Sequence, residues 1–291
     1  MKKLYVAYQK GTFPTGELLQ IESAEDVQAD MVCYLSNEQR YYLPERALTD
    51  EELLEMIDFE TRLEYALGER YEELHAEQIK EMQGQETAVK KELQEEKGVD
   101  EAEAIKLAAQ WAKDLYGLKL EDFQINTRLD TTSYLWKNYD AVYEIVYTIP
   151  GYENYNLYID AHTSALIEVL SYNSEASHKE ITVSELKDSL QTRKEEALQF
   201  LEARLQVSEN YTHAYCYYVA TEGKISNSVQ MAFVTKDNMA YVVTLNGGEL
   251  ELYSKLSYEA YQKYLVESPK AIHKTYQWEE MEIPLEKKNA N

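Results

Sequence analysis

The sequence contains three places where polar and apolar residues follow the order that starts a helix. In 48–53 (LTDEEL), Thr49 can accept a hydrogen bond from the backbone three residues on, and Glu52 can reach back. The segment 99–104 (VDEAEA) repeats this order with Asp100 as cap. The third segment, 181–186 (ITVSEL), has the apolar residues Ile181 and Leu186 at its two ends. We therefore predict helices that begin near residues 50, 101 and 183.

The first of these helices is predicted to be long, because apolar residues recur about every 3.5 positions as far as residue 93. Gly68 and Gly84 each disfavour a helix by about 1 kcal/mol relative to alanine, so we expect a break near one of them. The second helix is predicted to end at Gly117, a residue type that often caps helices.

After the second and third helices the apolar period changes to two, the period of a half-buried strand. Every odd position of 139–149 is apolar or aromatic. Strands are predicted there and at 155–160, 165–172, 211–220, 229–235, 240–245 and 249–253, with Asn246-Gly247-Gly248 as the last hairpin turn. The predicted fold class is α+β, with tandem modules of one helix packed on an antiparallel sheet, preceded by an α-rich N-terminal region.

The two predicted sheets end in segments that align with each other. Residues 158–166 (YIDAHTSAL) align with residues 242–250 (VVTLNGGEL), so that the segment with Asp160, His162, Thr163 and Ser164 takes the place of the Asn-Gly-Gly turn. This alignment suggests a diverged internal repeat. It also favours a turn over an active-site loop at Asp160.

We predict four parts of the chain from these patterns. Residues 1–98 form an N-terminal region of short strands and a long acidic helix, 99–175 and 179–265 form the two α+β modules, and 266–291 form a polar tail. The polar stretch 174–179 is the clearest linker. From residue 269 the tail is expected to return as an edge strand.

The charge of the chain limits the partners that it can bind. The formal net charge is −24, from 29 basic and 53 acidic residues. Such a chain is a poor partner for phosphate backbones or anionic lipid surfaces, so we exclude nucleic acid. Residues 45–103 alone carry 20 acidic and 7 basic residues, which predicts a solvated helical face that could attract a basic partner.

The sequence contains no apolar run of about 18 residues that would span a bilayer, and the apolar run at 4–8 is too short for a secretory signal. We expect either a cytoplasmic protein or one whose leader or anchor lies outside this chain. Cys33 and Cys216 each lie in a strand-like segment, which favours buried free thiols and leaves one long-range bridge open.

The stretch Ile159-Asp160-Ala161-His162-Thr163, followed by Leu166-Ile167, resembles the last hairpin of the PepSY domain, a small α+β module of bacterial envelope proteins. Ser164 stands where that family usually has glycine. The second copy keeps Gly248-Glu249-Leu250 but lacks the aspartate and the threonine. Each similarity covers about 70 residues.

The segment 46–59 also resembles one that precedes such modules in envelope proteins of Gram-positive bacteria. The resemblance implies an extracytoplasmic chain in the cell envelope, tied to the membrane only through an anchor outside this chain. It further implies a noncatalytic role in sensing, regulation or protease inhibition, with an envelope protein as partner. The family has no established catalytic residues to carry over.

The sequence lacks the short motifs that carry familiar chemistry. The patterns G-x-x-x-x-G-K-[ST], G-x-G-x-x-G, G-x-S-x-G, H-E-x-x-H and C-x-x-C are absent. The histidines at 75, 162, 178, 213 and 273 show no metal-ligand spacing. We therefore predict no catalytic residue, no cofactor and no metal.

Four residues are candidates for partner contact: Tyr134, Trp136, Asp160 and His162. The aromatic pair lies in a predicted loop, where an exposed tryptophan would suit an interface or a sugar. The pattern favours the alternative, in which Trp136 folds back over the sheet edge. Our first hypothesis is a noncatalytic binding or regulatory protein that uses exposed sheet edges or the acidic first helix. The alternatives are a secreted glycan hydrolase with two carboxylates, at least one of perturbed pKa, and a structural spacer.

Overall fold

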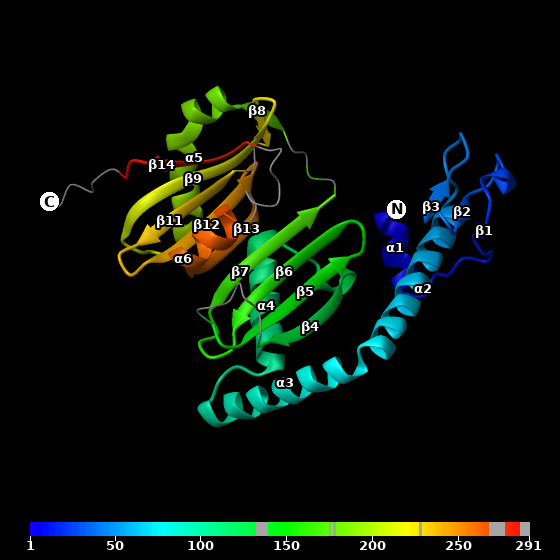
Figure 1. Ribbon diagram of the computed structural model, residues 1–291, viewed down its shortest axis with the longest axis horizontal. Helices are drawn as coiled ribbons and strands as arrows, with labels where there is room; N and C mark the ends of the chain where they lie inside the picture. The colour runs from blue at the N-terminus through cyan, green and yellow to red at the C-terminus, as the bar shows by residue number, and fades with distance from the viewer. Residues whose placement is uncertain (132–138, 175, 177–178, 227–228, 268–276, 286–291) are drawn as a thin grey trace. The chain divides into compact units, whose positions relative to one another are not determined.

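The computed structural model describes residues 1–131, 139–174, 176, 179–226, 229–267 and 277–285. Contacts divide the chain into two compact units, residues 1–84 and 85–291. The described residues form a mixed α/β protein with six helices and a large antiparallel sheet (Figure 1). None of the described helices has the length and apolar character needed to cross a membrane.

The first unit combines a small three-stranded sheet with helices. It begins with helix α1 (Lys2–Gln9), which the apolar pattern did not predict. Strand β1 (Leu19–Ile21) pairs in parallel with β2 (Cys33–Leu35), which pairs antiparallel with β3 (Arg40–Tyr42). A 3-10 turn, η1 (Ala24–Asp26), precedes β2.

The long acidic helix divides at His75 into α2 (Asp50–Leu74) and α3 (Ala76–Glu96), and α3 crosses from the first unit into the second. The predicted break at Gly68 or Gly84 is therefore wrong. Each glycine disfavours the helix by only about 1 kcal/mol, which neighbouring helical turns offset. At His75 the backbone itself leaves helical geometry, at φ −118° and ψ 20°.

The three predicted helix starts are confirmed in α2, α4 (Glu101–Tyr116) and α5 (Val183–Arg204). Thr49 and Thr182 each accept the amide of a glutamate three residues on, and that glutamate returns to the cap backbone. Asp100 accepts the amide of Glu103 at the start of α4. Helix α4 ends at Gly117, whose φ of +65° is one that glycine adopts without a steric penalty.

The second unit contains an eleven-stranded sheet in which all neighbouring strands pair antiparallel. Its main order is β4-β5-β6-β7-β13-β12-β11-β9-β10-β8, and β14 pairs with the free side of β9. The strands are β4 (Gln124–Asp130), β5 (Val142–Ile149), β6 (Glu153–Asp160), β7 (Leu166–Asn173), β8 (Glu180–Thr182), β9 (Tyr211–Thr221), β10 (Lys224–Ser226), β11 (Gln230–Thr235), β12 (Met239–Asn246), β13 (Glu249–Ser257) and β14 (Gln277–Ile283).

The sheet contains a first strand group, β4 to β7, and a second strand group, β9 to β13. Strands β8 and β14 pair with β10 and β9 of the second group. The two groups join where β7 pairs with β13, in the register Leu170 with Leu252, Val169 with Tyr253 and Glu168 with Ser254. We call this pairing the seam. The predicted edge strand of the tail is confirmed, because β14 lies along β9.

One face of the sheet carries the main core. Buried alanines of α4 and buried leucines of α5 share this core with inward residues of both strand groups, such as Ile145 and Phe233. The opposite face of the second strand group packs against α6 (Tyr258–Ala260) and the π-helical turn η4 (Tyr261–Glu267). Another 3-10 turn, η2 (Leu120–Asp122), links α4 to β4. Both cysteines are buried free thiols.

The connection between α3 and α4 is fixed against the turn between β6 and β7. The Val99 amide donates to the Ala161 carbonyl at 2.7 Å. A Cβ atom at Gly98 would lie 2.9 Å from that carbonyl and 2.8 Å from a methyl group of Leu93. The close approach of the two segments therefore requires glycine at position 98.

We expect Gly98→Ala to lower the free energy of unfolding by about 1–3 kcal/mol, because the carbonyl of Ala161 cannot move without breaking its hydrogen bond to Val99. Urea unfolding followed by circular dichroism measures the change. The control is Gly84→Ala, where the new methyl group meets no atom within 4 Å and should stabilise the helix by about 1 kcal/mol. Equal effects of the two substitutions would contradict the steric explanation.

Candidate functional site

Two of the four predicted partner-contact residues, Tyr134 and Trp136, lie outside the described residues. The other two lie in the turn between β6 and β7. The Asp160 carboxylate accepts the amide of His162 at 3.0 Å and the hydroxyl of Thr163. Asp160 is buried and holds the turn together, so the predicted turn at this place is confirmed.

The His162 ring points to a different carboxylate. Its Nδ1 atom lies 3.4 Å from Glu96 at the end of α3, and the ring is partly exposed. Asp160 therefore bonds the backbone of His162, whereas Glu96 is the carboxylate paired with its ring. The proposal that His162 touches a partner stays a prediction.

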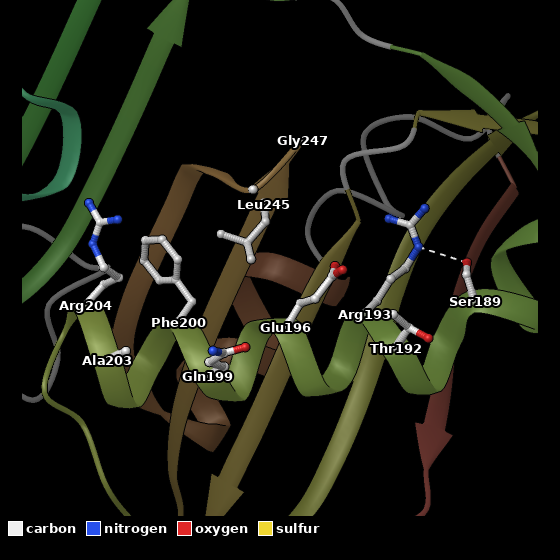
Figure 2. A pocket seen from close by; sticks show the side chains of 11 residues that line it. Ser189, Thr192, Arg193, Glu196, Gln199, Phe200, Ala203, Arg204, Leu245 and Gly247 are labelled. Atoms are coloured by element: carbon white, nitrogen blue, oxygen red, sulfur yellow. Dashed lines mark hydrogen bonds between the residues drawn. The ribbon is translucent and has the colours of Figure 1, made fainter.

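A groove of about 630 Å³ runs along α5 (Figure 2). The side chains of Arg193, Glu196 and Phe200 rise from the helix, and Leu245 of β12 and Gly247 of the turn after it line the opposite side. This volume lies within the range of small-molecule sites.

The cations of this groove already have structural partners. Arg204 donates to the carbonyls of Asp114 and Leu115, at 2.7 and 3.1 Å, and so caps the negative end of α4. Arg193 donates to the Ser189 hydroxyl at 3.0 Å. Both guanidinium groups therefore serve the fold through these contacts. Among the residues that line the groove, Glu196 is the one carboxylate.

Metal and thiol chemistry have little support in the described residues. Across the described ranges, no three His, Cys, Asp or Glu side chains are grouped so that they could hold a metal ion. Burial raises the pKa of the Cys216 thiol to about 12, so this thiol stays protonated and is a weak nucleophile at neutral pH.

A row of polar side chains crosses the seam on the sheet face opposite the main core. The strand register places Arg128 of β4 beside Glu144 of β5, then Tyr158 of β6, Glu168 of β7 and Ser254 of β13. We call these five residues the seam row. They come from five neighbouring strands, so their positions are set by backbone pairing.

A bulge in β7 decides which face Glu168 occupies. The register shifts after Tyr158, which pairs with Glu168, while the next residue of β6 pairs with Leu166. Leu166 and Val169 both lie in the main core, so Ile167 and Glu168 between them belong to the opposite face. Without this extra residue, strict alternation from Leu166 would turn the carboxylate into the core.

The contacts within the row are uneven. Arg128 lies 2.9 Å from the Glu144 carboxylate, which also accepts the Tyr158 hydroxyl at 2.7 Å. Glu168 receives the Ser254 hydroxyl at 2.7 Å. Glu144 thus has a cation and a phenol, whereas the contact of Glu168 is a neutral hydroxyl.

This environment disfavours the charged form of Glu168. The residue is 8% exposed, and burial raises its pKa to about 7. The Ser254 hydrogen bond acts in the opposite direction, and the negative charge of Glu144 adds to the rise. Glu168 therefore changes its charge near neutral pH, at the place where the two strand groups meet.

Sequence reasoning assigned 165–172 to a strand and gave no role to Glu168. The available signal was one acidic residue inside the apolar run ALIEVL, where each neighbour favours burial. The seam partner Ser254 lies 86 residues away, so the sequence pattern could not pair them.

Comparisons with known proteins add no relative: no family model, no curated protein and no solved structure matches the chain.

The pKa of Glu168 predicts a pH-dependent stability. Because folding raises this pKa from about 4.5 to about 7, the folded state binds a proton more tightly. The resulting stabilisation is complete below pH 4.5 and is lost as the pH rises through 7. We expect Glu168→Gln to be about 2–3 kcal/mol more stable than wild type at pH 8.

Urea unfolding at pH 4.5 and pH 8 measures this difference. At pH 4.5 the two chains should be equally stable, because glutamine resembles protonated glutamate in shape and hydrogen bonding. The matched control is Glu144→Gln, which lies in the same row and loses an ion pair. A Glu168→Gln chain that is less stable than wild type at pH 8 would show that the carboxylate is favoured in its charged form.

Proposed function

We propose that the protein is a noncatalytic regulatory protein of the bacterial cell envelope, in which the seam between two PepSY-like modules responds to proton concentration. The modules are residues 99–175 and 179–265, each a helix followed by antiparallel strands. The extracytoplasmic location and the envelope partner follow from the resemblance described above and belong to this proposal. The observation that carries it is the buried carboxyl group of Glu168 at the pairing of β7 with β13.

Several features support the tandem arrangement. Helix α4 precedes β4 to β7, and helix α5 precedes β9 to β13. The hairpins β6–β7 and β12–β13, whose sequences align, occupy corresponding places in the two groups. Their last strands are the two that pair at the seam.

The seam is a suitable place for a switch because few backbone contacts form it. Three residue pairs join β7 to β13, whereas β5 and β6 share eight. Loss of the Glu168 proton would place a buried negative charge at one of these three pairs, near the carboxylate of Glu144. The charged state therefore favours local opening, which would expose the edges of β7 and β13.

Exposed strand edges are binding elements in their own right. An edge presents unpaired amides and carbonyls that can add a strand from another protein. Under this proposal, the proton controls whether a partner strand can compete for β7 or β13. The change of protonation and the binding of a partner strand would then both take place at the seam.

The carboxylate pair also bears on the glycan hydrolase alternative, which requires two carboxylates and one perturbed pKa. Glu144 and Glu168 flank the same tyrosine, two strand spacings apart, or about 9–10 Å. A general acid must touch its substrate, however, and Glu168 is covered by its neighbours. The regulatory function is therefore favoured, and loss of hydrolysis of an envelope glycan in Glu168→Gln would reverse this choice.

Amide hydrogen exchange tests the proposed switch. We expect the protection factors of residues 168–170 and 252–254 in the full chain to fall about ten-fold between pH 5.5 and pH 8, after division by intrinsic exchange rates. In Glu168→Gln the same factors should stay constant, because no charge develops at the seam.

Glu144→Gln serves as the matched control and should keep the fall in protection. A fall of equal size in Glu168→Gln would assign the pH response to other groups. Constant protection in the wild-type chain would show that the seam stays closed when Glu168 loses its proton.

A further inference from the structure

A pocket of about 150 Å³ lies where β7 and β13 separate. The pairing of the two strands stops at Leu170 and Leu252, and residues beyond this pair line the pocket. Residues 171–173 of β7 form one side, and Asn246 with residues 249–251 of the β12–β13 hairpin form the other. This volume is too small for a drug-sized molecule, but it accommodates one functional group of a larger ligand.

Three tyrosines line the pocket: Tyr116 at the end of α4, Tyr155 of β6 and Tyr172 of β7. The rings of Tyr116 and Tyr155 are in contact, with centroids 4.7 Å apart and planes inclined at 53°. Tyr172 is 58% exposed, so its ring borders the opening. Aromatic walls of this kind suit an alkyl chain or an organic cation.

The pocket carries negative charge. Glu249 and Glu251 are the charged residues among the described residues that line it. Glu251 is the extra residue of a β-bulge, because the register with β12 skips from Leu250 to Leu252. Bulges often redirect a side chain next to a functional site. We call Tyr116, Tyr155, Tyr172, Glu249 and Glu251 together the tyrosine pocket.

The Tyr155 hydroxyl is a buried polar group that a ligand could satisfy. The residue is 6% exposed, and the described part of the chain offers its hydroxyl no hydrogen-bond partner. The Tyr116 hydroxyl, in contrast, donates to the Leu250 carbonyl. Burial raises the pKa of both phenols, and the charge of Glu249 adds to the rise at both. Glu249 therefore lies near both buried tyrosines.

Charge distinguishes between the possible ligands. An anion would meet two carboxylates, and a neutral sugar would gain little from them. Arg204 is held at the carbonyls of Asp114 and Leu115 and does not line the tyrosine pocket. A primary ammonium group meets opposite charge there, and its three N–H donors match the available acceptors.

We propose that the tyrosine pocket binds the primary ammonium group of an alkyl amine, either a small organic amine or a lysine side chain. Glu249 and Glu251 accept two of its N–H donors, and the Tyr155 hydroxyl accepts the third. The rings of Tyr116 and Tyr172 contact the alkyl chain. This inference goes beyond the proposed function, because it does not depend on the protonation of Glu168.

An NMR titration of the ¹⁵N-labelled full chain tests the pocket. The probe is n-butylammonium chloride, the neutral control is n-butanol, and sodium chloride corrects for ionic strength. We expect the amides of residues 171–173 and 246–251 to shift and saturate with a Kd that rises with salt. The Kd of n-butanol should be about ten-fold higher or more, because it lacks the charge.

A second titration identifies the source of the ammonium group. Its probe is Nα-acetyl-lysine methylamide, which presents a lysine side chain without other charges. A Kd equal to or below that of n-butylammonium would favour a lysine of a partner protein. A higher Kd would favour a free amine.

Variants locate the binding. Glu249→Gln keeps the shape of the side chain and removes its charge, so the Kd of n-butylammonium should rise about ten-fold. Tyr155→Phe keeps the ring and should raise the Kd about three-fold, with an unchanged urea midpoint because the hydroxyl lacks a partner in the fold. The matched control is Glu202→Gln, an exposed carboxylate on α5, which should leave the Kd within about two-fold of wild type.

Three outcomes would overturn the inference. The first is that n-butylammonium causes no saturable shifts, or that n-butanol binds equally well. The second is an unchanged Kd in Glu249→Gln, which would place the ammonium group elsewhere. The third is that glucose, and not n-butylammonium, shifts the same amides, because the site would then recognise a sugar. Glu168→Gln should bind n-butylammonium as wild type does, so failure of the seam proposal is separable from failure here.

Discussion

Backbone pairing between β7 and β13 is the constraint on which the second unit depends. It turns two strand groups into one sheet and brings the helices α4 and α5 into a common hydrophobic core. Other contacts reinforce the same joint: the hydroxyls of Tyr116 and Ser171 both donate to the Leu250 carbonyl, at 3.0 and 2.7 Å. The seam is therefore short in backbone pairs but reinforced by two side-chain hydrogen bonds to Leu250.

Burial at this joint raises the pKa of the Glu168 carboxyl group. Glu144 lies on the same sheet face but keeps a guanidinium and a phenol as partners. Glu168 has a serine, and the cost of removing its charge from water dominates. In a chain with 53 acidic residues, position in the sheet is what makes this one acid titrate near neutral pH.

The sequence pattern located local structure well and distant contacts poorly. Helix starts at residues 50, 101 and 183 were predictable because a cap and its partner lie three residues apart. The hairpin at Gly247 was predictable for the same local reason. Strand β4 was missed, because its exposed polar residues leave little alternation in the sequence QINTRLD.

The candidate site shows the same division. The Asp160 turn could be predicted, since its hydrogen bonds reach only two and three residues along the chain. The seam row could not, because its five residues come from five strands and one β-bulge sets the side on which Glu168 lies. No periodic pattern records a register shift of that kind.

The seam also has a consequence for how the chain is made. Strands β4 to β7 follow each other in sequence and pair as neighbours, so the first strand group can form from local contacts during synthesis. The partner of β7 begins at residue 249, about 80 residues later. Until that segment leaves the ribosome, the nascent chain presents an unpaired strand edge. Aggregation at this stage would compete with folding, and a chaperone that covers such edges would protect it.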